Sequence, residues 1–373
     1  MRVLVVGGGI GGLAAGIGLR RVGIDVTVLE QARELEPIGA GIGLAANALH
    51  ALDRLGVGDA IRARGEVARR LRALKPNGDV VVEIEGREML GVHRADLQEV
   101  LARGAGDALR LGVACDGFRD ANDRVVVTGA DGAELEGDVL VGADGLRSKT
   151  RSWLLDDGLP SYAGYVGWRA VTALEDESLR GGMTETWGRG ARFGLVPIGG
   201  GRVYWFVSES APEPEAPVIS GDKERLAQLV AGWHDPIQAA IASTSADAIS
   251  GTGIYARAPA RTWGRGRVTL LGDAAHPMTP DLSQGAAQAL EDAVVLAASL
   301  RDEADPLSGL RAYEAERQRR TAPIVKRSRA AGRLAQASSV LGASARDLVM
   351  GSLPDRLHGI QQARIVDTEL PAL

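Results

Sequence analysis

The chain has 373 residues, of which 45% are apolar, so it is long enough for two domains or for one large domain with an insertion. A net charge of −5 without a basic run argues against nucleic-acid binding, and a single cysteine with five scattered histidines excludes an internal disulfide and argues against a metal cluster. The apolar runs are too short for a membrane span or a signal peptide, so we expect a cytoplasmic protein.

The N-terminal segment predicts a complete β-turn-α-β unit. Residues 2–6 form a short apolar run typical of a buried strand, residues 13–22 favour a helix, and residues 26–29 favour a second strand. The turn between strand and helix, residues 7–12, reads Gly-Gly-Gly-Ile-Gly-Gly and contains G-x-G-x-x-G. This order is the context that a dinucleotide-binding glycine motif requires.

Each glycine of the motif has a physical task. Gly7 permits the tight turn, Gly9 lets backbone N–H groups approach a pyrophosphate, and Gly12 lets helix and strand pack closely. The helix N-terminus directs its partial positive charge at the phosphates. Glu30 ends the second strand, where its carboxylate could accept hydrogen bonds from a ribose. A ligand-free turn would need none of these additional features.

Two further features follow the second strand. Arg33 is close enough to Glu30 in sequence to reach a nucleotide, or it is a solvated surface charge. Residues 39–44 imitate a second phosphate loop, but Leu44 replaces the third glycine and no strand precedes the segment. We expect a loop whose backbone lies close to a flat ligand, followed by a helix at 45–55.

The next segments predict a hairpin and a helix. Residues 68–84 alternate around a Pro-Asn-Gly turn at 76–78, which indicates a β-hairpin. A helix then starts at His93, and Arg94 and Gln98 lie four residues apart on one face of it. A cation and an amide on one face suit a phosphate and a flavin or ribose edge, and they suit a plain surface helix equally well.

Two more strands are predicted to end at the functional edge of the sheet. After a hairpin around Asp131-Gly132, residues 138–142 form a buried strand that leads into Asp144. Residues 267–271 form another, leading into Gly272-Asp273, with a helix from Gly285 to Leu300 beyond. In a parallel sheet the carboxyl ends of strands line the ligand crevice, so both aspartates are placed at that edge.

The middle and the end of the chain differ in character. Alternating and aromatic segments between residues 162 and 255 predict an antiparallel sheet, with a helix at 223–233, and we expect this lobe to cover the nucleotide domain. Gly199-Gly200-Gly201 lies between two of its strands and predicts a hairpin turn rather than a phosphate loop. Helices are expected at 307–329 and 330–350.

Four motifs in this order carry a resemblance over nearly the whole chain: residues 7–12 with Glu30, the Arg94 helix, Val141–Gly145, and Leu271–Pro277. The chain resembles the single-component FAD-dependent aromatic monooxygenases of the para-hydroxybenzoate hydroxylase type. Residues 279–281 and 291–296 look most like the branch with salicylate hydroxylase and FAD-dependent urate hydroxylase.

The resemblance implies an α/β fold. A Rossmann-like FAD-binding domain with a glutathione-reductase-type βαβ unit would carry an inserted antiparallel substrate domain and C-terminal helices. The implied division is FAD-binding parts at 1–70, 93–160 and 259–300, a substrate-domain hairpin at 71–92, a substrate-binding sheet at 161–258, and C-terminal helices at 301–373.

The resemblance also implies the reaction. NADPH or NADH would reduce FAD, and O2 would then form a flavin C4a-hydroperoxide that hydroxylates an aromatic or heteroaromatic ring. In this reading Glu30 binds the adenosine ribose, Asp273 the ribityl hydroxyls, and the helix from Gly285 faces the flavin ring. The candidate cofactor-binding residues are Gly7, Gly9, Ile10, Gly11, Gly12, Glu30, Gln31, Arg33, Gly43, Leu44, Arg94, Gln98, Asp144, Asp273, Pro280, Gly285, Ala286 and Ala287.

Two positions depart from the family pattern. Ser283 stands where the family has the first glycine of Gly-Gln-Gly, so it is strained if that position needs a positive φ. Ala287 replaces an Asn or Cys and loses a side-chain contact to the flavin.

Candidate catalytic residues come from the urate hydroxylase resemblance. Arg192 would bind an anionic or carbonyl-rich ring and Tyr204 would donate a hydrogen bond, and each also fits an ordinary structural place. They share a sheet face only if the intervening loop has three residues, so that Val196 opposes Tyr204. Trp168 and Arg169 are further candidates, although Trp168 also suits the core.

Two other functions remain open: a non-oxygenating flavoprotein oxidoreductase of the same fold, and a non-catalytic flavin-binding protein. A halogenase is disfavoured, because the sequence has no Trp-x-Trp-x-Ile-Pro segment. His276 is interpreted as a structural loop residue rather than a general base. Expected partners are the ring substrate and O2, without nucleic acid, a membrane span or a metal, and the protein is expected to be a monomer or homodimer.

Overall fold

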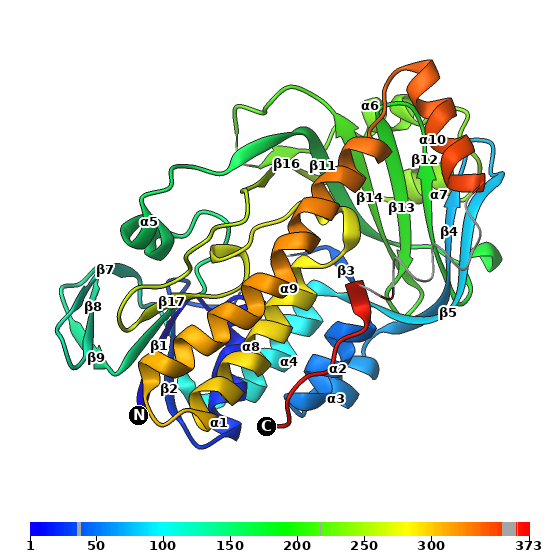
Figure 1. Cartoon of the computed structure of the whole chain (residues 1–373). Coiled ribbons are helices and arrows are strands. Elements are labelled where there is room, and N and C mark those ends of the chain that lie inside the picture. Colours follow the sequence, from blue (N-terminus) through cyan, green and yellow to red (C-terminus); the bar gives the residue numbers. More distant parts are fainter. Residues whose placement is uncertain (36–38, 217, 353–362, 364) are drawn as a thin grey trace.

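The computed structural model describes residues 1–35, 39–216, 218–352, 363 and 365–373. Figure 1 shows a parallel sheet with its helices at one end of the molecule and a large curved sheet at the other. The long helix α9 (Pro306–Ala335) runs beside α8 and extends toward the curved sheet. Among the described helices, none combines the length and the apolarity needed to cross a bilayer.

The parallel sheet has five strands in the order β17-β10-β1-β2-β6. These strands are β1 (Arg2–Val6), β2 (Asp25–Glu30), β6 (Leu109–Leu111), β10 (Val139–Gly142) and β17 (Val268–Leu270). The chain leaves β1 toward β2 on one side, while β10 lies on the other side, so the strand order reverses at β1. A ligand crevice forms outside the carboxyl ends of the strands at such a point.

Three helices pack around the parallel sheet and build the main apolar core: α1 (Ile10–Arg21), α4 (Arg94–Ala105) and α8 (Gly285–Asp302). Glycines allow the close approach of α1. A Cβ atom on Gly12 would lie 1.8 Å from the Gly7 carbonyl oxygen, and one on Gly16 would lie 2.8 Å from Val28. The helix therefore sits nearer to its strands than larger residues would allow.

The curved sheet has nine strands in the order β15-β16-β11-β14-β13-β12-β4-β5-β3, and only the β12–β4 pair is parallel. The strands are β3 (Gly41–Ala45), β4 (Glu66–Leu74), β5 (Val80–His93), β11 (Ser161–Ala173), β12 (Gly182–Trp187), β13 (Ala191–Pro197), β14 (Arg202–Ser210), β15 (Ile219–Ser220) and β16 (Ser250–Ala256). On one face it carries α6 (Lys223–Leu229) and α7 (Ile237–Ser243), with which it forms a second apolar core.

The remaining elements surround these two units. They are α2 (Ala46–Arg54), α3 (Gly58–Arg62), α5 (Lys149–Leu155), α10 (Val340–Ser352) and a small antiparallel sheet of β7 (Cys115–Asp120), β8 (Val125–Gly129) and β9 (Glu134–Gly137). Both predicted hairpin turns are confirmed, at Pro76–Gly78 between β4 and β5 and at Asp131-Gly132 between β8 and β9. The three-glycine turn between β13 and β14 is confirmed as well.

The prediction of a loop at 39–44 was wrong. Residues Gly41–Ala45 form β3, which pairs antiparallel with β5 at the end of the curved sheet. Its glycines weaken strand propensity, and its partner strand is distant in sequence, so tertiary pairing overrides the local signal. A Cβ on Gly41 would lie 2.2 Å from Tyr204 Cβ, which explains why glycine stands there.

Several boundaries differ from the predictions. The first helix begins at Ile10 rather than Leu13, and α6 ends at Leu229 rather than Trp233. The last helices divide at residues 336–339, because α9 continues through Pro323 to Ala335. The short elements β6, β7, α3 and α7 were not predicted, since segments of three to seven residues give little periodicity.

Candidate active site

The glycine turn has the shape of a phosphate cradle. Gly7 has a φ of +111°, and a Cβ there would lie 2.4 Å from the Ala143 carbonyl oxygen, so only glycine fits. At Gly9, by contrast, a Cβ would meet nothing within 4 Å. Helix α1 starts at this point with neither a side-chain cap nor an acidic residue in its first turn. Its free N–H groups therefore face open space, which fits a pyrophosphate.

Glu30 is held in place beside this turn. Its carboxylate accepts hydrogen bonds from the Gly8 N–H at 2.7 Å and from the Ala32 N–H at 2.9 Å. Both bonds come from backbone and orient the side chain, while the remaining lone pairs stay available for ribose hydroxyls. The arrangement fits the nucleotide end of a dinucleotide.

The two predicted aspartates differ in their surroundings. Asp144 follows β10, and both of its carboxylate oxygens accept hydrogen bonds from the turn that it begins: one from the Ser148 hydroxyl at 2.5 Å and one from the Thr150 N–H at 3.0 Å. Asp273 follows β17 and has no hydrogen-bond partner among the residues that the structure describes. Asp144 therefore shapes the turn beside Gly7, and Asp273 is the carboxylate left free for a ligand.

Asp273 and Arg94 reveal a recess between the sheets. Both side chains are exposed, yet burial among protein atoms raises the pKa of Asp273, and burial followed by the nearby Arg169 lowers the pKa of Arg94. An exposed group with such a shift lies in a recess walled by protein rather than on an open surface. We refer to the space around the side chains of Arg94, Asp273, Arg169 and Tyr204 as the crevice.

Helix α8 points its N-terminus into the same region. The N-terminal residues Gly285 and Ala286 are half-buried, Gln284 provides no side-chain cap, and the first turn has no acidic residue. A Cβ on Gly285 would lie 3.8 Å from Asp273 Oδ1. The N–H groups are thus free to face negative charge, such as that of a reduced flavin ring.

Ser283, just before this helix, adopts the left-handed conformation, with φ +51° and ψ 35°. The position therefore does need a positive φ, and serine meets that need at an energetic cost. Ala287 is buried in the core, so its side chain does not face the crevice.

A buried polar network supports the loop between Gly272 and Gln284. Arg317 in α9 donates to Glu291 Oε2 and to Asp292 Oδ1, both at 2.6 Å. Asp292 Oδ2 in turn accepts from the Gly272 N–H at 2.9 Å and lies 2.6 Å from His276 Nε2. Burial opposes the charge of Asp292, but His276 and Arg317 outweigh it and lower the pKa of Asp292 to about 2.

This network was not predicted. A signal was present, because Glu291 and Asp292 interrupt an otherwise apolar helix, and buried acids require partners. His276 is buried against Asp292, in agreement with the structural role expected of it.

The curved sheet presents two different faces. Trp168, Phe193 and Trp205 lie on the face beneath α6 and α7 and are buried. The opposite face, which we name the inner face, carries Arg169, Val171, Arg192, Tyr204 and Phe206. All of these except Arg192 are half-buried, and Arg169 and Tyr204 lie close enough to Arg94 to act on its charge, so this face borders the crevice.

The register is that of the three-residue loop and places Arg192 and Tyr204 on one face, since Val196 pairs with Tyr204 and Arg192 with Ser208. Arg192, however, is already occupied. It is buried, and its guanidinium donates to Glu185 Oε1 at 2.9 Å and to Asp281 Oδ1 at 2.5 Å. Burial disfavours its charge, but Glu185 and Asp281 prevail and raise the pKa of Arg192. It is no free cation for a substrate.

Other predicted residues lie at the margins. Leu44 is buried in the main core, so only the β3 backbone at Gly43 and Leu44 could touch a ligand. Gln31, Arg33 and Pro280 are exposed, and Gln98 is half-buried on α4 beyond Arg94. Their part in cofactor binding stays a prediction.

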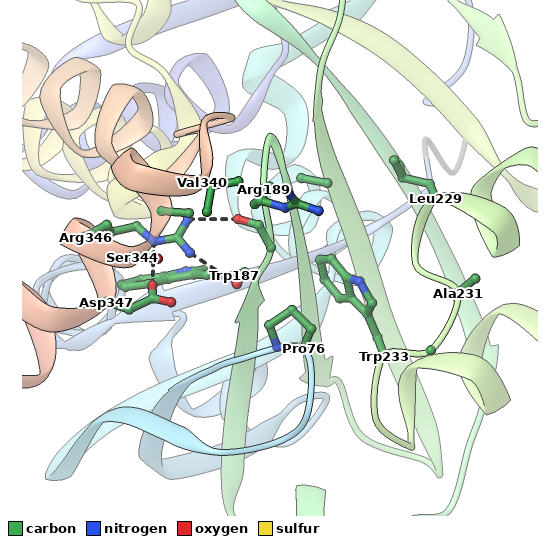
Figure 2. Close-up of a pocket in the computed structure, with 14 residues that line it drawn as sticks. Pro76, Trp187, Arg189, Leu229, Ala231, Trp233, Val340, Ser344, Arg346 and Asp347 are labelled. Atoms are coloured by element: carbon green, nitrogen blue, oxygen red, sulfur yellow. Dashed lines mark hydrogen bonds and ion pairs between the residues drawn. The ribbon is translucent and has the colours of Figure 1, made fainter.

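A separate recess of about 490 Å³ lies at the β12–β13 turn, between α10 and the segment after α6 (Figure 2). Trp187 and Trp233 line it, and Arg346 stacks over Trp187 while donating to the Gly188 carbonyl at 3.0 Å. It contains none of the predicted site residues, so it is distinct from the crevice.

Comparisons with known proteins agree with this geometry. A family described as "FAD binding domain" matches residues 1–328. The chain is 42% identical over 364 residues to the aurachin C monooxygenase/isomerase of Stigmatella aurantiaca, covering 94% of each chain. It is 37% identical over 381 residues to 3-hydroxybenzoate 6-hydroxylase 1 of Aquipseudomonas alcaligenes, covering 94% and 93%. The solved structure of Klebsiella pneumoniae HpxO with FAD and uric acid superposes with a TM-score of 0.90 at 31% identity, over 98% and 96% of the chains.

Proposed function

The chain belongs to the FAD-binding-domain family of flavoprotein monooxygenases, and on this premise we propose that it uses NADPH or NADH and O2 to hydroxylate an aromatic or heteroaromatic substrate. The observation that carries the proposal is the crevice itself. The turns after β1, β10 and β17 meet beside it, because a Cβ on Gly7 would lie 2.4 Å from the Ala143 carbonyl oxygen and one on Gly11 would lie 2.7 Å from Leu271. Arg169 and Tyr204 of the inner face border it near Arg94. The relatives named above support an aromatic substrate.

The residues present fit FAD. Glu30 would hold the adenosine ribose, the turn at Gly9 and the side chain of Arg94 the pyrophosphate, and Asp273 the ribityl hydroxyls. When bound, FAD supplies electron transfer from the nicotinamide and delivery of one oxygen atom of O2 to the ring.

The contribution of the chain is to position and enclose the reactants. The inner face, with Tyr204 and Phe206, would hold the substrate ring and exclude water from it. The uncapped N-terminus of α8 would favour negative charge on the cofactor ring by roughly 0.3–1 kcal/mol, or up to about 2 kcal/mol where it is partly buried. The predicted domain division, cytoplasmic location and oligomeric state remain predictions.

The test uses purified protein loaded with FAD. Consumption of NADPH and of NADH is followed across phenols, salicylates, purines and quinolones, and product mass is measured under ¹⁸O2. Faster consumption together with one labelled oxygen in the product supports the proposal. Nicotinamide oxidation without label would favour a non-oxygenating oxidoreductase, and flavin binding without any nicotinamide oxidation would favour a non-catalytic protein.

A further inference from the structure

The inner face carries a cation that the protein leaves without a counter-charge. Arg169 in β11 is half-buried and donates from Nη2 to the Thr252 hydroxyl. Within the part of the chain that the structure describes, no carboxylate lies in ion-pair distance of it. Arg192 on the same face, by contrast, has two carboxylates. A half-buried guanidinium without an anion is costly, so Arg169 is suited to receive an anion from a ligand.

The sheet register places Arg169 beside two aromatic side chains of the inner face. It lies directly opposite Phe206, and Val171 in the next row lies opposite Tyr204. The rings of Tyr204 and Phe206 are 5.9 Å apart, centre to centre, with 36° between their planes. On the other side of Phe206 stands Gly194, where a Cβ would lie 2.0 Å from the Phe206 ring. A planar ring over Tyr204 and Phe206 would have its edge toward Arg169.

A second cation, Arg94, lies near Arg169. Burial and then Arg169 lower the pKa of Arg94, and the Asp273 carboxylate partly compensates. Both arginines also act on Tyr204, although burial raises the pKa of that hydroxyl overall. Arg94 is placed to meet the cofactor pyrophosphate and is balanced in part by Asp273. Among the described residues Arg169 has no such balance, so its charge is left for one anionic group beyond the cofactor.

We propose that Arg169 binds an acidic oxygen of the substrate, so that the enzyme selects aromatic rings that carry a carboxylate, phenolate or enolate at one edge. The planar guanidinium can donate two parallel hydrogen bonds to such a group. The Tyr204 hydroxyl, which has no partner among the described residues, is placed to donate a further bond. This inference rests on the proposed aromatic hydroxylation.

The test measures ring binding to the FAD-loaded protein from the perturbation of flavin absorbance, so it does not depend on turnover. Three acids are paired with neutral counterparts: 3-hydroxybenzoate with 3-hydroxybenzamide, salicylate with salicylamide, and 4-hydroxy-2-quinolone with its 4-methoxy ether. We expect at least one acid to bind more tightly than its partner. Arg169→Gln should weaken that acid about 10- to 100-fold and its neutral partner less than about twofold, as expected for a charged hydrogen bond.

Controls separate the possible roles of the cation. Arg169→Lys should restore part of the preference for the acid, and Arg189→Gln, which alters an exposed arginine at the β12–β13 turn, should leave it unchanged. The proposal is overturned if no acid is preferred, or if Arg169→Gln weakens FAD binding while the preference persists. Hydroxylation of neutral rings only would refute the inference and leave the proposed function intact. Preferred binding of acids without oxygen transfer would support the inference and refute the proposed function.

Discussion

Replacing Arg317 with methionine should both destabilise the protein and weaken FAD binding. The side chain is 2% exposed, and it neutralises the buried carboxylates of Glu291 and Asp292 through two bonds of 2.6 Å. Removing one partner of a buried ion pair costs about 3–5 kcal/mol. Asp292 keeps His276 and the Gly272 N–H, and Glu291 keeps Asn47, so we expect the lower end of this range, about 3 kcal/mol.

The effect on the cofactor follows from the position of the network. Asp292 accepts a hydrogen bond from the N–H of Gly272, which precedes Asp273, the residue whose carboxylate is proposed to bind the ribityl chain. A shift of this loop that costs one hydrogen bond to the ligand would reduce FAD affinity by about tenfold. Urea unfolding of the apo-protein measures the first effect, and fluorescence titration with FAD measures the second.

A matched control lies on the same helix. Arg319 is exposed, and among the described residues its guanidinium donates to the Ala315 carbonyl of its own helix at 3.2 Å, so Arg319→Met should cost only about 0–0.5 kcal/mol. Combining Arg317→Met with Glu291→Gln and Asp292→Asn should recover part of the lost stability, because no unpaired charge then stays buried. If Arg317→Met costs no more than Arg319→Met, the reasoning about the buried network is wrong.

Three further predictions concern the same region. Gly9→Ala should change the free energy of unfolding of the apo-protein by no more than about 0.5 kcal/mol, because a Cβ there meets nothing within 4 Å, whereas Gly12→Ala should disrupt the fold. Gly9→Ala should nevertheless weaken FAD binding measurably in a titration, and an unchanged FAD affinity would contradict the phosphate cradle. Ser283→Gly should raise the free energy of unfolding by about 0.5–1 kcal/mol by relieving a φ of +51°, whereas Ser245→Gly, at a φ of −74°, should not; a loss of stability on Ser283→Gly would refute the strain. The pKa of Asp292 is lowered to about 2, so its ionised carboxylate stabilises the folded protein above pH 4 by about 2–3 kcal/mol, and this contribution is lost as the pH falls toward 2. The free energy of unfolding of Asp292→Asn, measured in urea, should therefore vary less with pH over that window than that of the wild type.

Local sequence patterns were sufficient to predict the nucleotide end of the site. The spacing of Gly7, Gly9 and Gly12 between strand and helix, with Glu30 after the second strand, could be interpreted without the structure, because every partner lies within one supersecondary unit. The hairpin turns were predictable for the same reason. Asp273 could be placed at the carboxyl edge because all parallel strands end on one side of a sheet.

Contacts between distant segments decided the rest. The sequence makes Arg192 a candidate substrate cation, but the fold places Asp281, 89 residues away, against its guanidinium. Arg169 remained without a carboxylate because its cross-strand neighbours are Phe206 and Ser250. Glycine content and residue spacing were determined by the sequence alone. Which charges are neutralised and which stay open to a ligand depends on the partners that folding brings together, and only the tertiary structure decided that.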